Sequence, residues 1–120
     1  MDERLAEKAR ELGRSIGQTD EYKALERARD RFSNDRASVT AVNRLSDIEG
    51  RIASALERGE EPADDVKVEY ESVFSELQAS PIYQGMVAAQ SNFDRILARV
   101  NEDISKGIET GAGSRIILPS

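Results

Sequence analysis

Residues 81–107 read PIYQGMVAAQSNFDRILARVNEDISKG, and they carry the strongest helical periodicity in the chain. Apolar or uncharged side chains recur there at alternating intervals of three and four, which is typical of a coiled-coil-like helix. At about 1.5 Å per residue this helix is about 40 Å long, too long for one short neighbour to cover. We therefore predict that its stripe is an oligomer or partner interface. The stripe consists of Tyr83, Met86, Gln90, Phe93, Leu97, Val100 and Ile104.

Gln90 is the one polar residue within this stripe. A buried amide can fix the register or the oligomer state of a coiled coil. The alternative is that Gln90 lies at the edge of the stripe, and this second interpretation is the one we favour.

Two further helical patterns flank a clear loop, and a start signal separates the second of them from the helix at 81–107. Ser80-Pro81 is a strong start signal, with serine as N-cap and proline at the first helical position. Before it, Val66, Tyr70, Val73 and Leu77 predict a helix that begins near residues 63–65. A second helix is predicted over residues 36–57, where Gly59 and Pro62 end it. Its stripe is Ala41, Leu45, Ile48, Ile52 and Leu56.

The N-terminal part of the chain predicts two shorter amphipathic helices, over residues 3–16 and 20–32. Gly17 and Thr19 separate them as a C-terminal glycine and an N-cap. The cap-rich cluster at residues 33–35 predicts a break or kink before the helix at 36–57. Whether those two helices run nearly continuously stays open.

We therefore predict an all-α protein of four or five helices, a helical hairpin or bundle with a long C-terminal helix. We expect that helix to pack against the helix at 36–57 in a single domain over residues 1–108, followed by a flexible tail over 109–120. The apolar end of the tail, residues 115–120, is either a frayed terminus or a segment that docks into a groove. Because Leu, Ile, Val and Phe are sparse, the core is thin, and we expect a homodimer or higher oligomer.

The composition excludes several kinds of chemistry. The 120 residues contain no cysteine and no histidine, which removes thiolate sites, disulfides, the commonest general base and the commonest metal ligand. We predict no catalytic, cofactor-binding or metal-binding residues. The charged N-terminus is unlike a secretory signal, and no apolar run approaches the roughly 18–20 residues of a membrane span. We expect a cytoplasmic protein without a membrane partner.

Charge is distributed unevenly. The net charge is −6, and the segment 57–80 supplies the imbalance. An overall acidic protein gains little from phosphate backbones, which disfavours nucleic acid as a direct ligand. An arginine-rich stretch at 27–36 is interpreted as a solvated, ion-paired helix surface, with local phosphate contact as the alternative. Acidic side chains around the loop are interpreted as a solvated cluster, with loose cation binding or partner contact as the alternative. They are Glu57, Glu60, Glu61, Asp64 and Asp65.

Five short segments, in order, resemble the YlbF/YmcA family of small helical proteins. They read ARELGRSI at 9–16, TDEYKAL at 19–25, LQASPIY at 77–83, AAQSNF at 88–93 and VNEDI at 100–104. The resemblance covers about residues 3–108. It implies a helical, oligomeric fold without enzymatic activity. The best-known members of that family are regulators of competence, sporulation and biofilm development, within a complex that assists an endoribonuclease in mRNA processing.

Some members carry cysteines linked to iron–sulfur clusters, and this chain has no cysteine, so we expect no cofactor. The function we predict is a non-enzymatic regulatory adaptor that acts through protein–protein contacts. Its expected partners are its own copies, sister family members or an endoribonuclease complex. The alternatives are direct RNA binding through the 27–36 arginines, a carboxylate-based enzyme or metal protein at the 57–65 loop, and a self-assembling structural or holdase-like protein.

Overall fold

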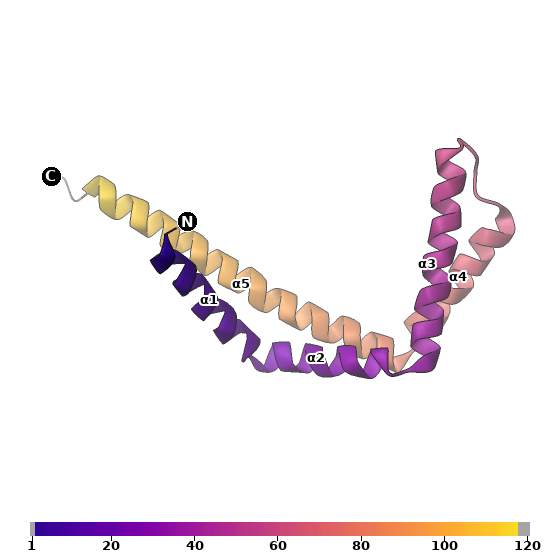
Figure 1. Ribbon diagram of the computed structural model, residues 1–120, viewed down its shortest axis with the longest axis horizontal. Helices are drawn as coiled ribbons and strands as arrows, with labels where there is room; N and C mark the ends of the chain where they lie inside the picture. Colours follow the sequence, from indigo (N-terminus) through magenta and orange to yellow (C-terminus); the bar gives the residue numbers. More distant parts are fainter. Residues whose placement is uncertain (1, 118–120) are drawn as a thin grey trace.

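The computed structural model describes residues 2–117, and over that range the chain forms five α-helices and no strand. In chain order they are α1 (Glu3–Gly17), α2 (Asp20–Ser33), α3 (Arg36–Glu57), α4 (Asp64–Ala79) and α5 (Pro81–Ile117) (Figure 1). The all-α prediction is confirmed, and each helix begins within a residue or two of its expected position.

Side-chain caps explain where the first three helices start. The carboxylate of Asp2 accepts a hydrogen bond from the Arg4 amide at 3.0 Å, and Thr19 Oγ1 accepts one from the Tyr22 amide at 3.1 Å. Asp35 caps α3 by accepting from the Ser38 amide at 3.0 Å. Each cap satisfies an amide that has no partner within the helix, so these three boundaries are fixed locally by sequence.

The helices form two arms that meet at a bend. One arm pairs α2 with α5, and the other is the antiparallel hairpin of α3 and α4 (Figure 1). The resulting shape is elongated, with extents of 71 × 38 × 23 Å. The predicted packing of α5 against the helix at 36–57 is therefore wrong, because α3 takes α4 as its neighbour instead.

Connection lengths account for this arrangement. Only Asn34 and Asp35 lie between α2 and α3, and only Ser80 lies between α4 and α5. Links this short turn the chain through a corner, whereas the loop at 58–63 is long enough to reverse it. Gly59 closes that loop with a φ of +72°, a conformation that costs glycine little. The question left open about α2 and α3 is settled by the Asp35 cap, which marks a full break.

The two arms differ in how much they bury. Ala41, Ile48, Val73 and Leu77 form one buried cluster between α3 and α4. In the other arm Leu25 of α2 is the fully buried large side chain among the described residues. The 14-residue α2 covers only part of the 37-residue α5, so most apolar side chains of α5 near the bend stay half-buried.

The last helix is longer than predicted. We expected it to end at Gly107, but α5 continues to Ile117. Glycine costs a helix about 1 kcal/mol and does not by itself stop one, and no proline interrupts this segment. Over residues 109–117 no backbone break therefore separates the predicted tail from α5, and the flexibility of the tail stays a prediction. The tail's end at residues 118–120 lies outside the described residues. Within residues 2–117, no helix combines the length and apolar character that a membrane crossing requires.

Candidate protein-interaction face

The seven predicted interface residues, here called the α5 stripe, divide into two parts. The part near the bend faces α2 of the same chain. The ring of Tyr83 lies 6.1 Å from that of Phe32, and the ring of Phe93 lies 5.2 Å from that of Tyr22, measured between centroids. Tilted aromatic pairs at these distances stabilise the α2–α5 pairing. Tyr83 and Phe93, with Met86, are only half-buried, so this pairing leaves part of each side chain uncovered.

The distal part of the α5 stripe has less cover. Leu97 and Val100 are half-buried, and Ile104 is 45% exposed. One turn further on, Ile108 is 66% exposed. Ile108 continues the same spacing but was left out of the predicted set, because the expected helix ended at Gly107. Exposure thus rises along the stripe as α5 passes beyond the end of α2 (Figure 1).

Gln90 lies at the edge of the helix pair, as we favoured. Its side-chain oxygen accepts a hydrogen bond from Arg29 Nη2 of α2 at 2.9 Å. Its amide nitrogen donates to Asp94 Oδ1, also at 2.9 Å. The contact that Gln90 makes is therefore within the chain, where it ties α2 to α5. A role in setting oligomer state stays a prediction.

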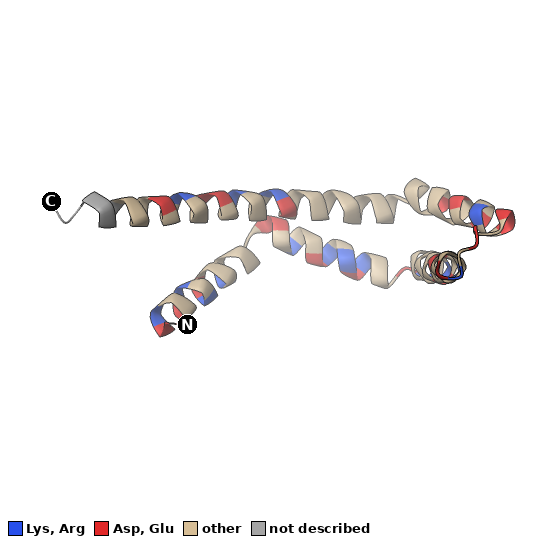
Figure 2. Ribbon diagram, turned by 90° about the horizontal axis from the view of Figure 1, so that it is seen from above, with Lys and Arg blue, Asp and Glu red and all other residues tan. Residues whose placement is uncertain are grey.

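The end of α5 nearest the bend carries no charged side chain from Pro81 to Phe93, as the tan ribbon in Figure 2 shows. Val87 lies in the middle of this uncharged segment and is 47% exposed. Two open grooves of about 540 and 500 Å³ flank it, and both are lined by Tyr83, Val87 and Ser91. Depletion of charge around exposed apolar side chains is typical of the centre of a protein interface.

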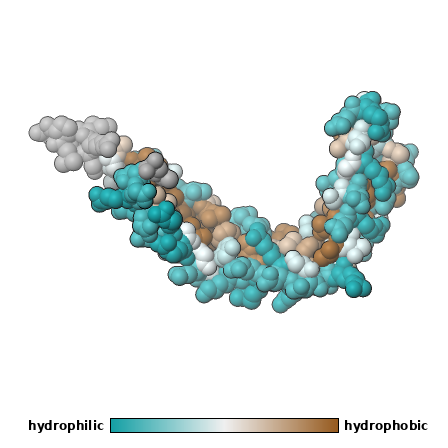
Figure 3. All heavy atoms as spheres, viewed as in Figure 1, coloured by the Kyte–Doolittle hydropathy of each residue, from teal (hydrophilic) through white to brown (hydrophobic). Residues whose placement is uncertain are grey.

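Figure 3 shows the wider setting of these residues. Apolar side chains gather along α5 and around the bend toward α3 and α4, while hydrophilic side chains cover α2 and much of α1. Sequence reasoning missed Val87 because it lies beside the three-and-four stripe rather than in it. The absence of charge from 81–93 was the signal that could have identified it.

The arginine-rich stretch lies on α2 except for Arg36, which begins α3, and basic residues are prominent on α2 in Figure 2. Arg27 and Arg31 line a groove of about 310 Å³ between α2 and α5, whose floor contains alanines and Gly85. The ion pairs that we expected for this surface are absent: among residues 2–117 neither Arg27 nor Arg31 lies within 4.0 Å of a carboxylate. The i and i+4 spacing places both guanidinium groups on one helix face without a neutralising partner.

The acidic loop after α3 is open to solvent. Arg58 Nε lies 3.5 Å from Glu60 Oε2, and both side chains are exposed. Within residues 2–117, no three acidic side chains converge in the way that a metal site requires. On the same arm Glu69 of α4 lies 3.7 Å from Arg44 and 3.6 Å from Arg51 of α3. Such exposed pairs orient helices but add little stability.

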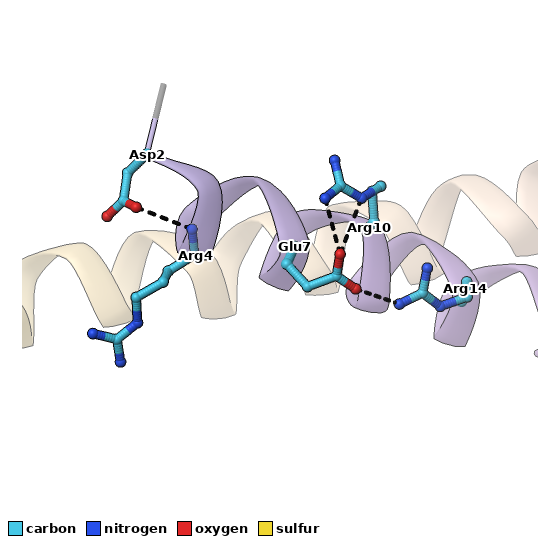
Figure 4. A network of polar contacts seen from close by, with 5 residues as sticks. All are labelled: Asp2, Arg4, Glu7, Arg10 and Arg14. Carbon is cyan, nitrogen blue, oxygen red and sulfur yellow. Dashed lines mark hydrogen bonds and ion pairs between the residues drawn. The ribbon is translucent and has the colours of Figure 1, made fainter.

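A small ionic network lies on the outer face of α1 (Figure 4). The Glu7 carboxylate accepts hydrogen bonds at 2.9 Å from Arg10 Nη2 and from Arg14 Nη2. The Arg10 guanidinium, followed by that of Arg14, lowers the pKa of Glu7 below its ordinary value. The network occupies the polar side of α1 and leaves the side with Leu5 and Leu12 unpaired.

Comparison with known proteins agrees with this architecture. The model of the family described as control of competence regulator ComK, YlbF/YmcA, matches residues 5–109. The chain belongs to the YlbF/YmcA family. The match spans nearly all of the predicted domain and confirms the resemblance carried by the five short segments.

The chain is also similar to a UPF0342 protein of Lactobacillus gasseri, 21% identical over 83% of this chain and 86% of the relative. A UPF0342 protein of Streptococcus mutans is 25% identical over 82% of this chain and 93% of the relative. None of these names states a catalytic activity.

Two solved structures share the YlbF/YmcA-like fold. One chain of the crystal structure of Bacillus subtilis RicA in complex with RicF superposes with a TM-score of 0.80 at 16% identity, over 93% of this chain and 99% of that one. A protein of unknown function from Bacillus stearothermophilus gives a TM-score of 0.64 at 20% identity, over 89% of this chain and 94% of that one. At these identities the likeness shows the fold alone. The bent, two-armed arrangement is therefore found beyond this chain.

Proposed function

We propose that this YlbF/YmcA-family protein is a non-enzymatic regulatory adaptor that works through protein–protein contacts made by α5. The observation that carries the proposal is the open apolar face of a body only two helices thick. The α5 stripe ends in exposed Ile104, and Val87 lies in an uncharged segment. The chain itself encloses neither of these apolar surfaces, and leaving them in water costs free energy.

Energetic magnitudes support an interface on this face. Full burial of a large apolar side chain contributes about 1.5–3 kcal/mol. Association costs about 4–15 kcal/mol in lost translational and rotational freedom. The distal α5 stripe and Val87 could be covered on two copies, or against a partner of similar size. The free energy gained by burying them would then exceed the lower end of the association cost. We therefore expect a homodimer or a higher oligomer, or a complex with a sister family member.

The biological setting follows from the family. Its model is described in terms of control of a competence regulator, and the similarly folded RicA was crystallised with RicF. We propose that the chain likewise works in a protein complex, one that assists an endoribonuclease in mRNA processing. Elongated helical arms suit this role because they expose much surface for their mass.

Affinity capture from native cytosol, with and without nuclease and read by mass spectrometry, tests the proposal. We expect nuclease-resistant recovery of an endoribonuclease or of a sister family member with the wild-type protein. Ile104→Asp on the α5 stripe should abolish that recovery. Val68→Asp is the matched control, since Val68 is, like Ile104, an exposed branched side chain but lies on the other arm. Equal loss with both variants, or recovery of no specific protein, contradicts the proposal.

Direct RNA binding is the second candidate, favoured by the groove in which Arg27 and Arg31 lack carboxylate partners among residues 2–117. Phosphate contacts release counterions, so the affinity would fall steeply with added salt. Fluorescence anisotropy with a single-stranded RNA at several salt concentrations measures this. Binding that survives Arg27→Ala with Arg31→Ala would exclude the groove as the RNA site.

A further inference from the structure

The groove between α2 and α5 that contains Arg27 and Arg31, here called the arginine groove, differs in charge from the protein as a whole. The net charge of the chain is −6, yet among residues 2–117 no acidic side chain lines this groove. Its α5 side lies within the uncharged segment from Pro81 to Phe93. The arginine groove is therefore a locally basic site on an acidic protein, next to the basic residues of α2 in Figure 2.

The polar groups of the arginine groove are donors that lack acceptors. Among residues 2–117, neither Arg27 nor Arg31 donates a side-chain hydrogen bond, although other arginines do. Asn92 also lines the groove, and its Oδ1 accepts a hydrogen bond from Arg95 Nη2 at 2.7 Å. That bond leaves the amide nitrogen of Asn92 as a third donor. Three donor groups without a carboxylate match a ligand that is rich in acceptors.

The spacing of the two arginines sets the spacing of those acceptors. Arg27 and Arg31 are one helical turn apart, which is about 6 Å along the axis of α2. Carboxylates four residues apart on a second helix have the same spacing. Each planar guanidinium can bind one carboxylate through two parallel hydrogen bonds. Lys23 lies one turn before Arg27 and extends the basic row.

Small side chains form most of the remaining lining of the arginine groove. They are Ala24, Ala28, Gly85, Ala88 and Ala89. A Cβ placed on Gly85 would meet no heavy atom within 4 Å, so the floor is open at this point. Two helices approach each other closely where the side chains at their contact are small. The floor therefore accepts the face of another helix if that face is also built from small residues.

The same lining favours a helix over two other ligands. An extended peptide would place unpaired backbone amides and carbonyls against a floor of methyl groups, whereas a helix pairs its own backbone groups. RNA phosphates also suit arginine, but single-stranded RNA is held as well by aromatic rings on which its bases stack. Among residues 2–117 no aromatic side chain lines the arginine groove.

We propose that the arginine groove binds a helix of a partner protein that carries two acidic side chains one turn apart on a face of small residues. The carboxylates bind the guanidinium groups of Arg27 and Arg31, and the small residues cover Gly85 and Ala89. The bound helix lies on α2 and α5 as the third helix of this arm. The inference rests on the proposed function and deepens it, because it gives the adaptor's partner a chemical class.

Fluorescence anisotropy with a labelled synthetic peptide and the full-length chain tests this proposal. The probe is an alanine-rich peptide of about 20 residues, long enough to form a helix in water, with glutamates four residues apart on one face. A control peptide of the same composition distributes its glutamates over all faces. We expect the control to bind at least about tenfold more weakly than the probe. Equal affinities, or no binding of the probe, would overturn the proposal.

Two substitutions within α2 separate the arginine groove from charge in general. Arg27→Gln should weaken binding of the probe by about tenfold, because it removes charge-assisted hydrogen bonds. Arg29→Gln changes the net charge equally, but Arg29 lines a different groove and donates to Gln90. It should leave the affinity almost unchanged. The same loss of affinity in both variants would contradict binding in the arginine groove.

Filling the floor tests the face of small residues. Gly85→Leu places a large side chain in the groove and should not unfold the chain, since leucine favours a helix more than glycine does. We expect about tenfold weaker binding of the probe, with urea stability at least equal to that of the wild type. Gly107→Leu is the matched control, because Gly107 is equally open but lies outside the groove. Equal affinities of the two variants would refute close contact with the floor.

A competition experiment distinguishes the acidic helix from RNA. Polyuridine is added to the complex of the chain with the labelled probe, and the anisotropy is followed. We expect no displacement at concentrations where the unlabelled probe displaces its labelled copy. If polyuridine displaces the probe more effectively than the unlabelled probe does, the arginine groove is an RNA site and the proposal is wrong.

This proposal and the proposed function can fail separately. If nuclease-resistant capture of a protein depends on Ile104 while the probe does not bind, the adaptor role stands and the assignment of the arginine groove is wrong. If the probe binds and its affinity depends on Arg27 and Gly85 while nothing specific is captured, the groove binds an acidic helix and the adaptor role is wrong.

Discussion

The α3–α4 arm and the α2–α5 arm are built from similar helices, yet only the first closes on itself. In the α3–α4 arm two stripes of small and branched side chains meet face to face and bury Ile48 and Val73 completely. In the α2–α5 arm one short helix meets a much longer one, and Leu25 is the large side chain buried there among the described residues. Helices of 22 and 16 residues enclose a buried cluster, whereas helices of 14 and 37 residues leave much of the longer helix uncovered.

The largest effect is expected from breaking the closed arm. Ile48→Ala removes a fully buried side chain from the centre of the α3–α4 cluster. Leu/Ile-to-Ala changes in cores cost about 2–5 kcal/mol because a cavity remains. Urea unfolding followed by circular dichroism should show a loss in this range. A loss below about 1 kcal/mol would mean that the arm is not the stable centre of the molecule.

A smaller loss is expected in the open arm. Phe93→Ala removes the ring that contacts Tyr22, but Phe93 is only half-buried. We expect the free energy of unfolding to fall by about 1–2 kcal/mol, from lost area and the aromatic pair. The same urea experiment measures this loss when it is run at a protein concentration below any dimer dissociation constant. A cost equal to that of Ile48→Ala would show that both arms are equally well packed.

The N-caps of α3 and α4, the two helices of the closed arm, differ from each other. Asp35 accepts hydrogen bonds from both the amide and the hydroxyl of Ser38, whereas the α4 N-cap Ala63 has no side-chain acceptor. Asp35→Ala should cost about 1 kcal/mol of unfolding free energy. Ala63→Ser should stabilise by about 0.5–1 kcal/mol, since it supplies the missing acceptor. Thermal melts of both variants measure this, and a destabilising Ala63→Ser would contradict the capping argument.

The smallest effect concerns the pH dependence of α1. Because the folded pKa of Glu7 lies below its ordinary value of 4.5, the network stabilises α1 above that pH and is lost as pH falls through the folded pKa. Carbon chemical shifts of α1 should therefore move toward coil values below pH 4.5, and Glu7→Gln should remove this transition. A midpoint above 4.5 for Glu7 would contradict the assigned ion pairs.

The helices themselves could be predicted because their signals are local. Thr19, Asp35 and Ser80-Pro81 mark boundaries within a few residues of where they act, and the stripes give the apolar faces. The pairing of helices could not be predicted from the stripes, since periodicity tells which face is apolar and not which partner covers it. The lengths of the links held that information, because Ser80 alone cannot reverse a chain.

The candidate site was predicted in part. The α5 stripe was found as an apolar face, but Phe93 and Tyr83 contact α2, which nothing in the spacing of α5 reveals. Ile108 was left out of the predicted stripe because Gly107 was interpreted as the end of the helix. The exposure of Leu5 and Leu12 followed from the divergence of α1 from α5 (Figure 2), which depends on the three-dimensional course of the chain after Gly17. Whether the stripe binds a partner stays a prediction.

The order of the links also has a kinetic consequence. The α3–α4 hairpin joins segments close in sequence, whereas Arg29 and Gln90 are 61 residues apart. Once the hairpin closes, however, it holds the end of α2 beside the start of α5, so the long loop between them no longer opposes their pairing. We expect the hairpin to form in the folding transition state and the α2–α5 pair to form after it. A φ-value near 1 for Ile48→Ala with one near 0 for Phe93→Ala would establish that order, and the reverse pattern would refute it.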